Sequence, residues 1–228
     1  MPFSTHSPIP INEKLTVEEL ITKLRKRVKV NLIACAAEEK CCDKFVSEAE
    51  LNRPGLALTG YLDVFSWQRV QIIGNTETNY LEKLPEDKQL EAFGNITKFD
   101  LPIIFLTNGN TLPNALLENA TQRGIPIYTT PYETTRFMLL LKDLLDDQFA
   151  LQTMVHGAMV DVYGVGILIV GKSGIGKSEI ALDLVERGHR LVADDVVMIT
   201  KKGSVLMASA TTMSKHFMEI RGLGIVDV

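Results

Sequence analysis

The chain has 228 residues, of which 46% are hydrophobic and 23% are charged, and its formal net charge is −4 at pH 7. This length suits two domains of ordinary size, and the hydrophobic content is sufficient for packed cores. The net negative charge gives no sign of a basic surface, so nucleic acid is not an expected partner. No apolar run reaches the roughly 18 residues that a membrane span needs.

The N-terminal segment 1–14 contains Pro and Ser but lacks the apolar core of a secretion signal. We therefore expect a loose segment and no export. The three cysteines, Cys35, Cys41 and Cys42, cannot all pair with one another, and their spacing does not fit a zinc site. The pattern predicts reduced thiols in a cytoplasmic protein.

The first predicted helix begins at Thr16, which is followed by two glutamates. Its apolar face comprises Leu20, Ile21 and Leu24. A basic cluster lies on the other face and at the helix end; it consists of Lys23, Arg25, Lys26 and Arg27. Such a cluster can serve as a nucleic-acid arm, but a solvated face near a helix C-terminus, where positive charge suits the dipole, explains it more simply.

Strand and helix patterns alternate over the next hundred residues. The predicted strands are 28–33, 70–74, 102–107 and 125–128, and the predicted helices are 76–94, 113–123 and 133–153. Alternation of this kind favours an α/β layer with a mainly parallel sheet. We assign residues 15–148 to an N-terminal α/β domain and residues 149–228 to a second domain, with the last helix as the connector.

The second domain contains a complete G-x-x-x-x-G-K-[ST] phosphate-binding loop, Gly171-Lys172-Ser173-Gly174-Ile175-Gly176-Lys177-Ser178. Its glycines let backbone N–H groups face phosphate oxygens, Lys177 can reach the β- and γ-phosphates, and the Ser178 hydroxyl can bind Mg²⁺. The apolar run 165–170 predicts a buried strand before the loop, and residues 180–185 have helical periodicity, with Gly188 just beyond them. A glycine-rich turn without a ligand is the alternative, and these flanks favour binding of a nucleotide triphosphate.

Four further polar residues are candidates for the same site. Asp194 and Asp195 follow an apolar strand 17 and 18 positions after the loop lysine, and the strand should return them beside the loop. A carboxylate there can hold Mg²⁺ or accept a proton, although neighbours on a strand need not share a role and a surface turn is the alternative. His156 lies one strand before the loop, and a lone histidine is more often structural. Glu219 can complete a metal site.

Arg221 stands two residues after Glu219 and can bind phosphate, although an ordinary salt bridge is equally compatible with the pair. Together with these residues, segments 52–77, 156–197 and 218–228 resemble the HPr kinase/phosphorylase family, bacterial regulators of carbohydrate uptake. The resemblance runs from about residue 17 to the end. It implies an N-terminal α/β domain followed by a P-loop kinase domain of the phosphoenolpyruvate-carboxykinase-like type.

The activity implied by the resemblance is ATP-dependent phosphorylation of a serine on the phosphocarrier HPr, with a phosphate-dependent reverse reaction that releases pyrophosphate. By the same resemblance Asp195 is the base and, in reverse, the acid, Lys177 holds phosphate, and His156 is an active-site histidine. Ser178 and Glu219 match the Mg²⁺ ligands, and Arg221 falls in a segment important in both directions. The family forms homohexamers.

Two departures from the family stand out. Lys172 replaces an aspartate common in the loop, and little effect is expected because this position contacts through its backbone. Family members continue well beyond Val228, so we expect a shortened version without one catalytic arginine and the partner-docking helices. The alternatives are a small-molecule or phosphoenolpyruvate-carboxykinase-like phosphotransferase, and a nucleotide-binding module without turnover. The N-terminal domain argues against the first, and ATP binding without serine phosphorylation would indicate the second.

Overall fold

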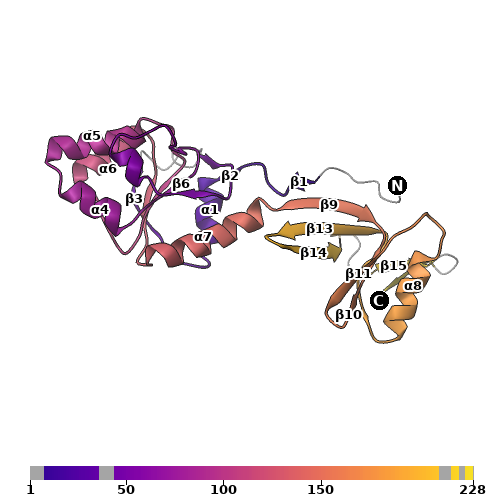
Figure 1. Ribbon diagram of the computed structural model, residues 1–228. Coiled ribbons are helices and arrows are strands. Elements are labelled where there is room, and N and C mark those ends of the chain that lie inside the picture. The colour runs from indigo at the N-terminus through magenta and orange to yellow at the C-terminus, as the bar shows by residue number, and fades with distance from the viewer. Residues whose placement is uncertain (1–7, 36–43, 211–216, 221–223, 228) are drawn as a thin grey trace. The chain divides into compact units, whose positions relative to one another are not determined.

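The computed structural model describes residues 8–35, 44–210, 217–220 and 224–227, the last two ranges by backbone only (Figure 1). The chain divides into two compact units. One comprises Asn12–Phe149, and the other combines the residues before Asn12 with those from Ala150 onward. Within the described ranges, no helix has the length and apolar character that crossing a membrane requires.

The unit 12–149 is built on a five-stranded sheet with the order β3-β8-β7-β6-β5. The strands are β3 (Asn31–Ala34), β8 (Ile127–Thr129), β7 (Ile104–Leu106), β6 (Val70–Ile73) and β5 (Leu51–Asn52). Four of them are parallel, and β3 runs antiparallel to β8 at one edge. The prediction of a mainly parallel sheet is confirmed.

Helices cover both faces of this sheet (Figure 1). They are α1 (Val17–Leu24), α3 (Gly55–Leu58), α4 (Asn75–Glu82), α5 (Glu86–Thr97), α6 (Asn114–Gln122) and α7 (Thr134–Gln148). On β6, Val70 and Ile72 pack with α1 and α7, whereas Ile73 packs with the helices of the other face. The period of two along the strand thus fills two separate hydrophobic clusters.

The start of α1 has the geometry that the sequence predicts. The Thr16 hydroxyl accepts the Glu19 N–H at 3.1 Å, and the Glu19 carboxylate accepts the Thr16 N–H at 3.1 Å. This reciprocal capping box satisfies two backbone donors that a helix start leaves free. The predicted apolar face is buried and the basic cluster is exposed, with Arg27 paired to Asp143 at 2.7 Å. The basic residues therefore form a solvated face.

Three predictions of elements in this unit need correction. The helix predicted at 76–94 is two helices, because Pro85 lacks an N–H group and prevents the chain from continuing α4 into α5. The helix predicted at 133–153 ends at Gln148, and the chain re-enters a strand at Leu151. The strand predicted at 28–33 begins only at Asn31.

The cysteines also depart from the expectation of reduced thiols. Cys35, which directly follows β3, takes part in a disulfide. Cys41 and Cys42 lie outside the described residues. The cysteines thus give no support to a cytoplasmic location.

The second unit contains two antiparallel sheets, with the orders β1-β9-β13-β14 and β11-β10-β12. The strands are β1 (Ile9–Pro10), β9 (Leu151–His156), β13 (Val196–Lys202), β14 (Val205–Ala210), β11 (Val165–Ile169), β10 (Ala158–Val162) and β12 (Arg190–Ala193). The helix α8 (Lys177–Glu186) packs on β10 and β12, and β15 (Phe217–Ile220) forms a hairpin with β16 (Gly224–Asp227). Pairing of Ile9 with Gln152 gives order to part of the segment predicted to be loose.

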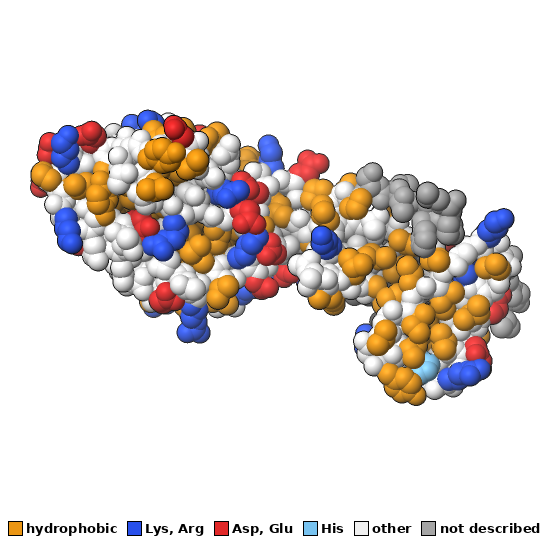
Figure 2. All heavy atoms as spheres, viewed as in Figure 1, with side chains coloured by type: hydrophobic (Ala, Val, Ile, Leu, Met, Phe, Trp, Pro, Cys, Tyr) orange, Lys and Arg blue, Asp and Glu red, His pale blue; other side chains and the backbone are white. Residues whose placement is uncertain are grey.

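The core of this second unit is small. Its fully buried cluster consists of Ala158, Val160 and Ala181, and partly buried neighbours surround them. The strand β11, predicted to be buried, lies at the edge of its sheet, and Val165 is 65% exposed. Figure 2 shows many hydrophobic side chains at the surface of this unit. The apolar run correctly marked a strand, but composition does not distinguish an edge from a centre.

Candidate active site

The phosphate-binding loop connects β11 to α8. Gly174 and Gly176 have φ angles of +83° and +96°, and Gly176 is the N-cap of α8. Side chains other than glycine rarely adopt this left-handed region, so the two glycines allow the loop to turn tightly into the helix. The loop therefore ends at the N-terminus of a ten-residue helix, whose free N–H groups and dipole favour an anion.

The side chain of Lys177, near the end of the loop, contacts the backbone of Lys172, near its start. The Lys177 ammonium donates to the carbonyl oxygen of Lys172 at 3.3 Å, and the Ile175 N–H donates to the same oxygen at 3.4 Å. The Lys172 side chain is exposed and contributes only its carbonyl to these bonds. A charged side chain at position 172 is thus compatible with the loop, as the sequence predicts.

Asp194 directly follows β12 and returns to the loop. The Ser178 hydroxyl donates to the Asp194 carboxylate at 3.2 Å, and Asp194 is only 5% exposed. The pair places a hydroxyl and a buried carboxylate beside the helix start. Oxygen donors of this kind are the ligands that Mg²⁺ prefers, so these residues fit a site for that ion.

Asp195 has a different environment from its neighbour. Its φ angle is +66°, and its side chain is 82% exposed. The Asp195 carboxylate lies 3.9 Å from the imidazole of His156, which ends β9; this distance is longer than a hydrogen bond. The structure thus brings His156 and Asp195 together, and it separates a buried Asp194 at Ser178 from an Asp195 that is open to an incoming group.

The remaining two predicted site residues lie near the chain end. Glu219 belongs to β15, whose backbone lies beside α8, and only its backbone is described. Arg221 lies outside the described residues. In the part of the chain with described side chains, no group of three or more His, Cys, Asp and Glu residues could hold a metal ion.

One residue of this site was missed by the sequence analysis. The Gly157 N–H donates to the Asp195 carbonyl oxygen at 3.0 Å, which links the turn after β9 to the turn after β12. A glycine between two strand-like runs is the available signal, because it often marks a close approach of backbones. Nothing in the sequence indicates which backbone it meets.

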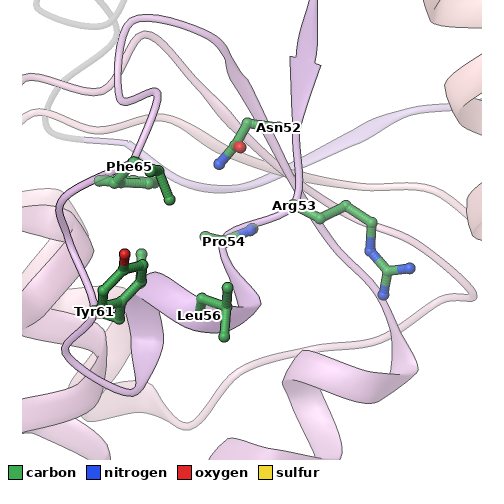
Figure 3. Close-up of a pocket in the computed structure, with 8 residues that line it drawn as sticks. Asn52, Arg53, Pro54, Leu56, Tyr61 and Phe65 are labelled. Carbon is green, nitrogen blue, oxygen red and sulfur yellow. The ribbon is translucent and has the colours of Figure 1, made fainter.

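The unit 12–149 has a hollow of its own, with a volume of about 150 Å³. Figure 3 shows Asn52, Tyr61 and Phe65 around it, while the Arg53 side chain points away. Arg53 instead donates to both oxygens of the 4% exposed Glu77, at 2.9 and 2.8 Å. The eight lining residues include no carboxylate or histidine, so this hollow lacks the groups that phosphoryl transfer needs.

In this chain an α/β domain is followed by a unit in which a glycine-rich loop connects the strand β11 to the helix α8. Comparison with known families agrees: the HPr Serine kinase N terminus matches residues 15–145, and the HPr Serine kinase C-terminal domain matches residues 147–228. The chain belongs to the HPr kinase/phosphorylase family.

Curated relatives share much of the sequence. The HPr kinase/phosphorylase of Chloroherpeton thalassium is 52% identical over 223 residues, which cover 96% of this chain and 65% of that protein. That of Chlorobium phaeovibrioides is 52% identical over 203 residues, or 88% and 60%. The solved Hpr(Ser) kinase/phosphatase of Coxiella burnetii is 37% identical over 33% of this chain and 50% of that chain, with a TM-score of 0.32. The chain therefore spans less than two thirds of the length of these relatives.

Proposed function

We propose that this chain carries the nucleotide site and the catalytic groups of an ATP-dependent kinase that phosphorylates a serine of the phosphocarrier HPr. In the reverse direction, inorganic phosphate would attack phosphoserine-HPr and release pyrophosphate. The balance of the two reactions would regulate carbohydrate uptake and catabolite repression. The observation that carries the proposal is the phosphate-binding loop with Asp195 and His156 beside one another and Asp194 bonded to Ser178.

The loop residues 171–178 would bind the phosphates of ATP. The N–H groups at the start of α8 and the Lys177 ammonium supply positive charge, and the left-handed glycines allow the backbone to approach. Ser178, Asp194 and Glu219 offer oxygen ligands for Mg²⁺, which when bound would neutralise charge on the phosphate oxygens. Asp194 would also orient the Ser178 hydroxyl.

Asp195 is the proposed general base, with His156 beside it. In the forward direction Asp195 accepts the proton of the HPr serine hydroxyl as the serine oxygen bonds to the γ-phosphorus and ADP leaves. In reverse, a phosphate oxygen bonds to the phosphoserine phosphorus, and Asp195 returns the proton to the departing serine oxygen. Its exposure supports this role, because a base for a protein substrate has to be reachable from solvent.

Arg221 would add a positive charge close to the transferring phosphoryl group. This role stays a prediction, as do assembly into homo-oligomers, hexamers in the family, and a cytoplasmic site of action. We propose neither a nucleic acid nor a membrane as a binding partner. The name shared by the relatives supports HPr as the protein partner.

The test is incubation of the chain with purified HPr and ATP labelled on the γ-phosphate. We expect label on an HPr serine, and no label with Lys177→Ala. Label transferred to a small molecule instead would favour a metabolite kinase. ATP binding without transfer to either acceptor would favour a binding module that lacks turnover.

A further inference from the structure

Two neighbouring segments pass together from one sheet of the second unit to the other. His156 on β9 opposes Val196 on β13, and Met159 on β10 opposes Ala193 on β12. The same register places Gly157 opposite Asp195, at the point where both segments leave one sheet and enter the next. The hydrogen bond from the Gly157 N–H to the Asp195 carbonyl oxygen therefore holds the two segments together at this crossing.

Gly157 also touches the strand that leads into the phosphate-binding loop. A Cβ atom at position 157 would lie 2.5 Å from the carbonyl oxygen of Ile169 and 3.2 Å from a methyl group of Val170. Ile169 ends β11, two positions before the first loop residue. Real Cβ atoms do not approach backbone oxygen this closely, so any side chain here would push the loop entry and the Asp195 turn apart.

We propose that Gly157 is a positioning residue that sets the distance between the phosphate-binding loop and the base Asp195. This inference rests on the function proposed above. Gly157 fixes the backbone of Asp195, which has a left-handed conformation that directs the carboxylate to solvent beside His156. Its missing side chain lets this backbone lie directly against the start of the nucleotide site.

Whether a side chain at position 157 displaces the loop entry or the Asp195 turn depends on how each of them is held in place. The loop entry continues into α8, which packs on two strands, whereas the Asp195 carbonyl oxygen is bonded to the Gly157 N–H, so a shift of Gly157 away from Ile169 carries the Asp195 backbone with it. A methyl group at position 157 should therefore displace Asp195 more than the loop. Misplacement of a catalytic group by about 1 Å can cost roughly 100-fold in rate, while phosphate binding through the intact loop persists.

The experiment compares Gly157→Ala with Gly166→Ala. Gly166 lies on β11, the strand that leads into the loop, and a Cβ there would meet only the flexible end of Met159. We expect Gly157→Ala to lower kcat for HPr phosphorylation by about 10- to 100-fold and to change the Kd for ATP by less than about threefold. The Gly166→Ala variant should keep both within about threefold of the wild-type values.

A double variant separates positioning from general damage. If Gly157 acts through Asp195, Gly157→Ala should cost less than about threefold when added to Asp195→Asn, because the group it positions is already lost. Losses that multiply in the double variant, or a wild-type rate in Gly157→Ala, would overturn the inference. A loss of ATP affinity equal to the loss of rate would do the same.

A second measurement does not depend on turnover or on folding of the variant. In the wild-type chain the amide hydrogen of Gly157 should exchange with solvent slowly, because it is bonded to the Asp195 carbonyl oxygen. Fast exchange at Gly157 would contradict the inference. If the wild-type chain transfers no phosphate to HPr, the proposed function fails, and slow exchange at Gly157 would still support the structural link.

Discussion

The two units bury their apolar residues very differently. The unit 12–149 has two large clusters on the faces of a parallel sheet, with Phe93, Phe105 and Phe137 fully buried. Among the residues with described side chains, the second unit buries a small cluster of Ala158, Val160 and Ala181, and Ile167 and Ile180 are more than 40% exposed. The loop, Asp195 and His156 all lie in the unit with the smaller core.

The polar residues of the two units also differ in their surroundings. In the unit 12–149 polar groups serve the fold, as when the buried Glu77 binds Arg53 and caps α4 through the Gly74 N–H at 2.9 Å. In the second unit Lys172 of the loop and Asp195 are exposed, whereas Asp194 is buried beside Ser178. A side chain that reacts with a second molecule has to be reachable from solvent, and the surroundings of Asp195 fit the role proposed for it.

Loss of the loop lysine should have the largest effect. Lys177→Ala removes the ammonium that would neutralise the phosphates of ATP, phosphoserine and pyrophosphate alike. We expect weaker ATP binding and the loss of both reaction directions, measured by calorimetry and by transfer of label. Unchanged affinity together with unchanged turnover would contradict the assignment of the loop.

The acidic pair should divide its roles. Asp195→Asn should lower the rates in both directions by roughly 10²-fold or more, as for a lost general base, and leave ATP binding largely intact. Asp194→Asn should mainly lower the affinity for Mg²⁺ and so raise the Mg²⁺ concentration that the reaction needs, because Asp194 contacts Ser178 and is buried. Rates measured over a series of Mg²⁺ concentrations distinguish the two, and a greater loss of proton transfer in Asp194→Asn would reverse our assignment.

The contrast between the cores predicts a selective loss of stability. Phe93→Ala removes a fully buried ring in the unit 12–149 and should cost about 3–5 kcal/mol. Trp67, the single tryptophan, packs at 6.2 Å from Phe99 in that unit and reports its unfolding by fluorescence. Val160→Ala, in the other unit, should leave the urea midpoint of this signal unchanged. An equal shift in both variants would mean that the units unfold as one.

The smallest effect concerns the start of α7. The Glu133 carboxylate accepts the N–H groups of Thr135 and Arg136, at 3.0 and 3.1 Å, and these bonds lower the pKa of Glu133. Because the folded-state pKa is depressed, the stabilisation is present above the unfolded-state pKa and is lost as the pH falls through the folded-state pKa. Glu133→Ala should therefore lower the melting temperature at pH 7, and its difference from wild type should vanish in acid. A difference independent of pH would exclude this cause.

The sequence predicted the first unit well because its strands and helices follow regular periods. The helix start at Thr16 and the strands β6, β7 and β8 of a mainly parallel sheet follow from local patterns, whereas β5 and the order of the strands were not predicted. The break between α4 and α5 is encoded locally as well, because Pro85 interrupts the helical period. Exposure of β11 depends on contacts distant in sequence, and no local pattern encodes it.

The site was predictable to a similar degree. The loop motif and the spacing of the acidic pair placed the right elements side by side, but they did not reveal which aspartate meets Ser178. That choice depends on the left-handed backbone at Asp195, for which the sequence gives no sign. The contact of Gly157 with Ile169 likewise arises only when three strands are assembled.

The central claim is that one phosphate-binding loop serves both directions of the reaction. Its most direct test is incubation of phosphoserine-HPr with the chain and inorganic phosphate, followed by identification of the phosphorus product. We predict pyrophosphate and unmodified HPr with the wild-type chain, and neither product with Lys177→Ala. Two results would contradict the claim. One is release of free phosphate from phosphoserine-HPr when no phosphate has been added, and the other is pyrophosphate formation by the Lys177→Ala variant.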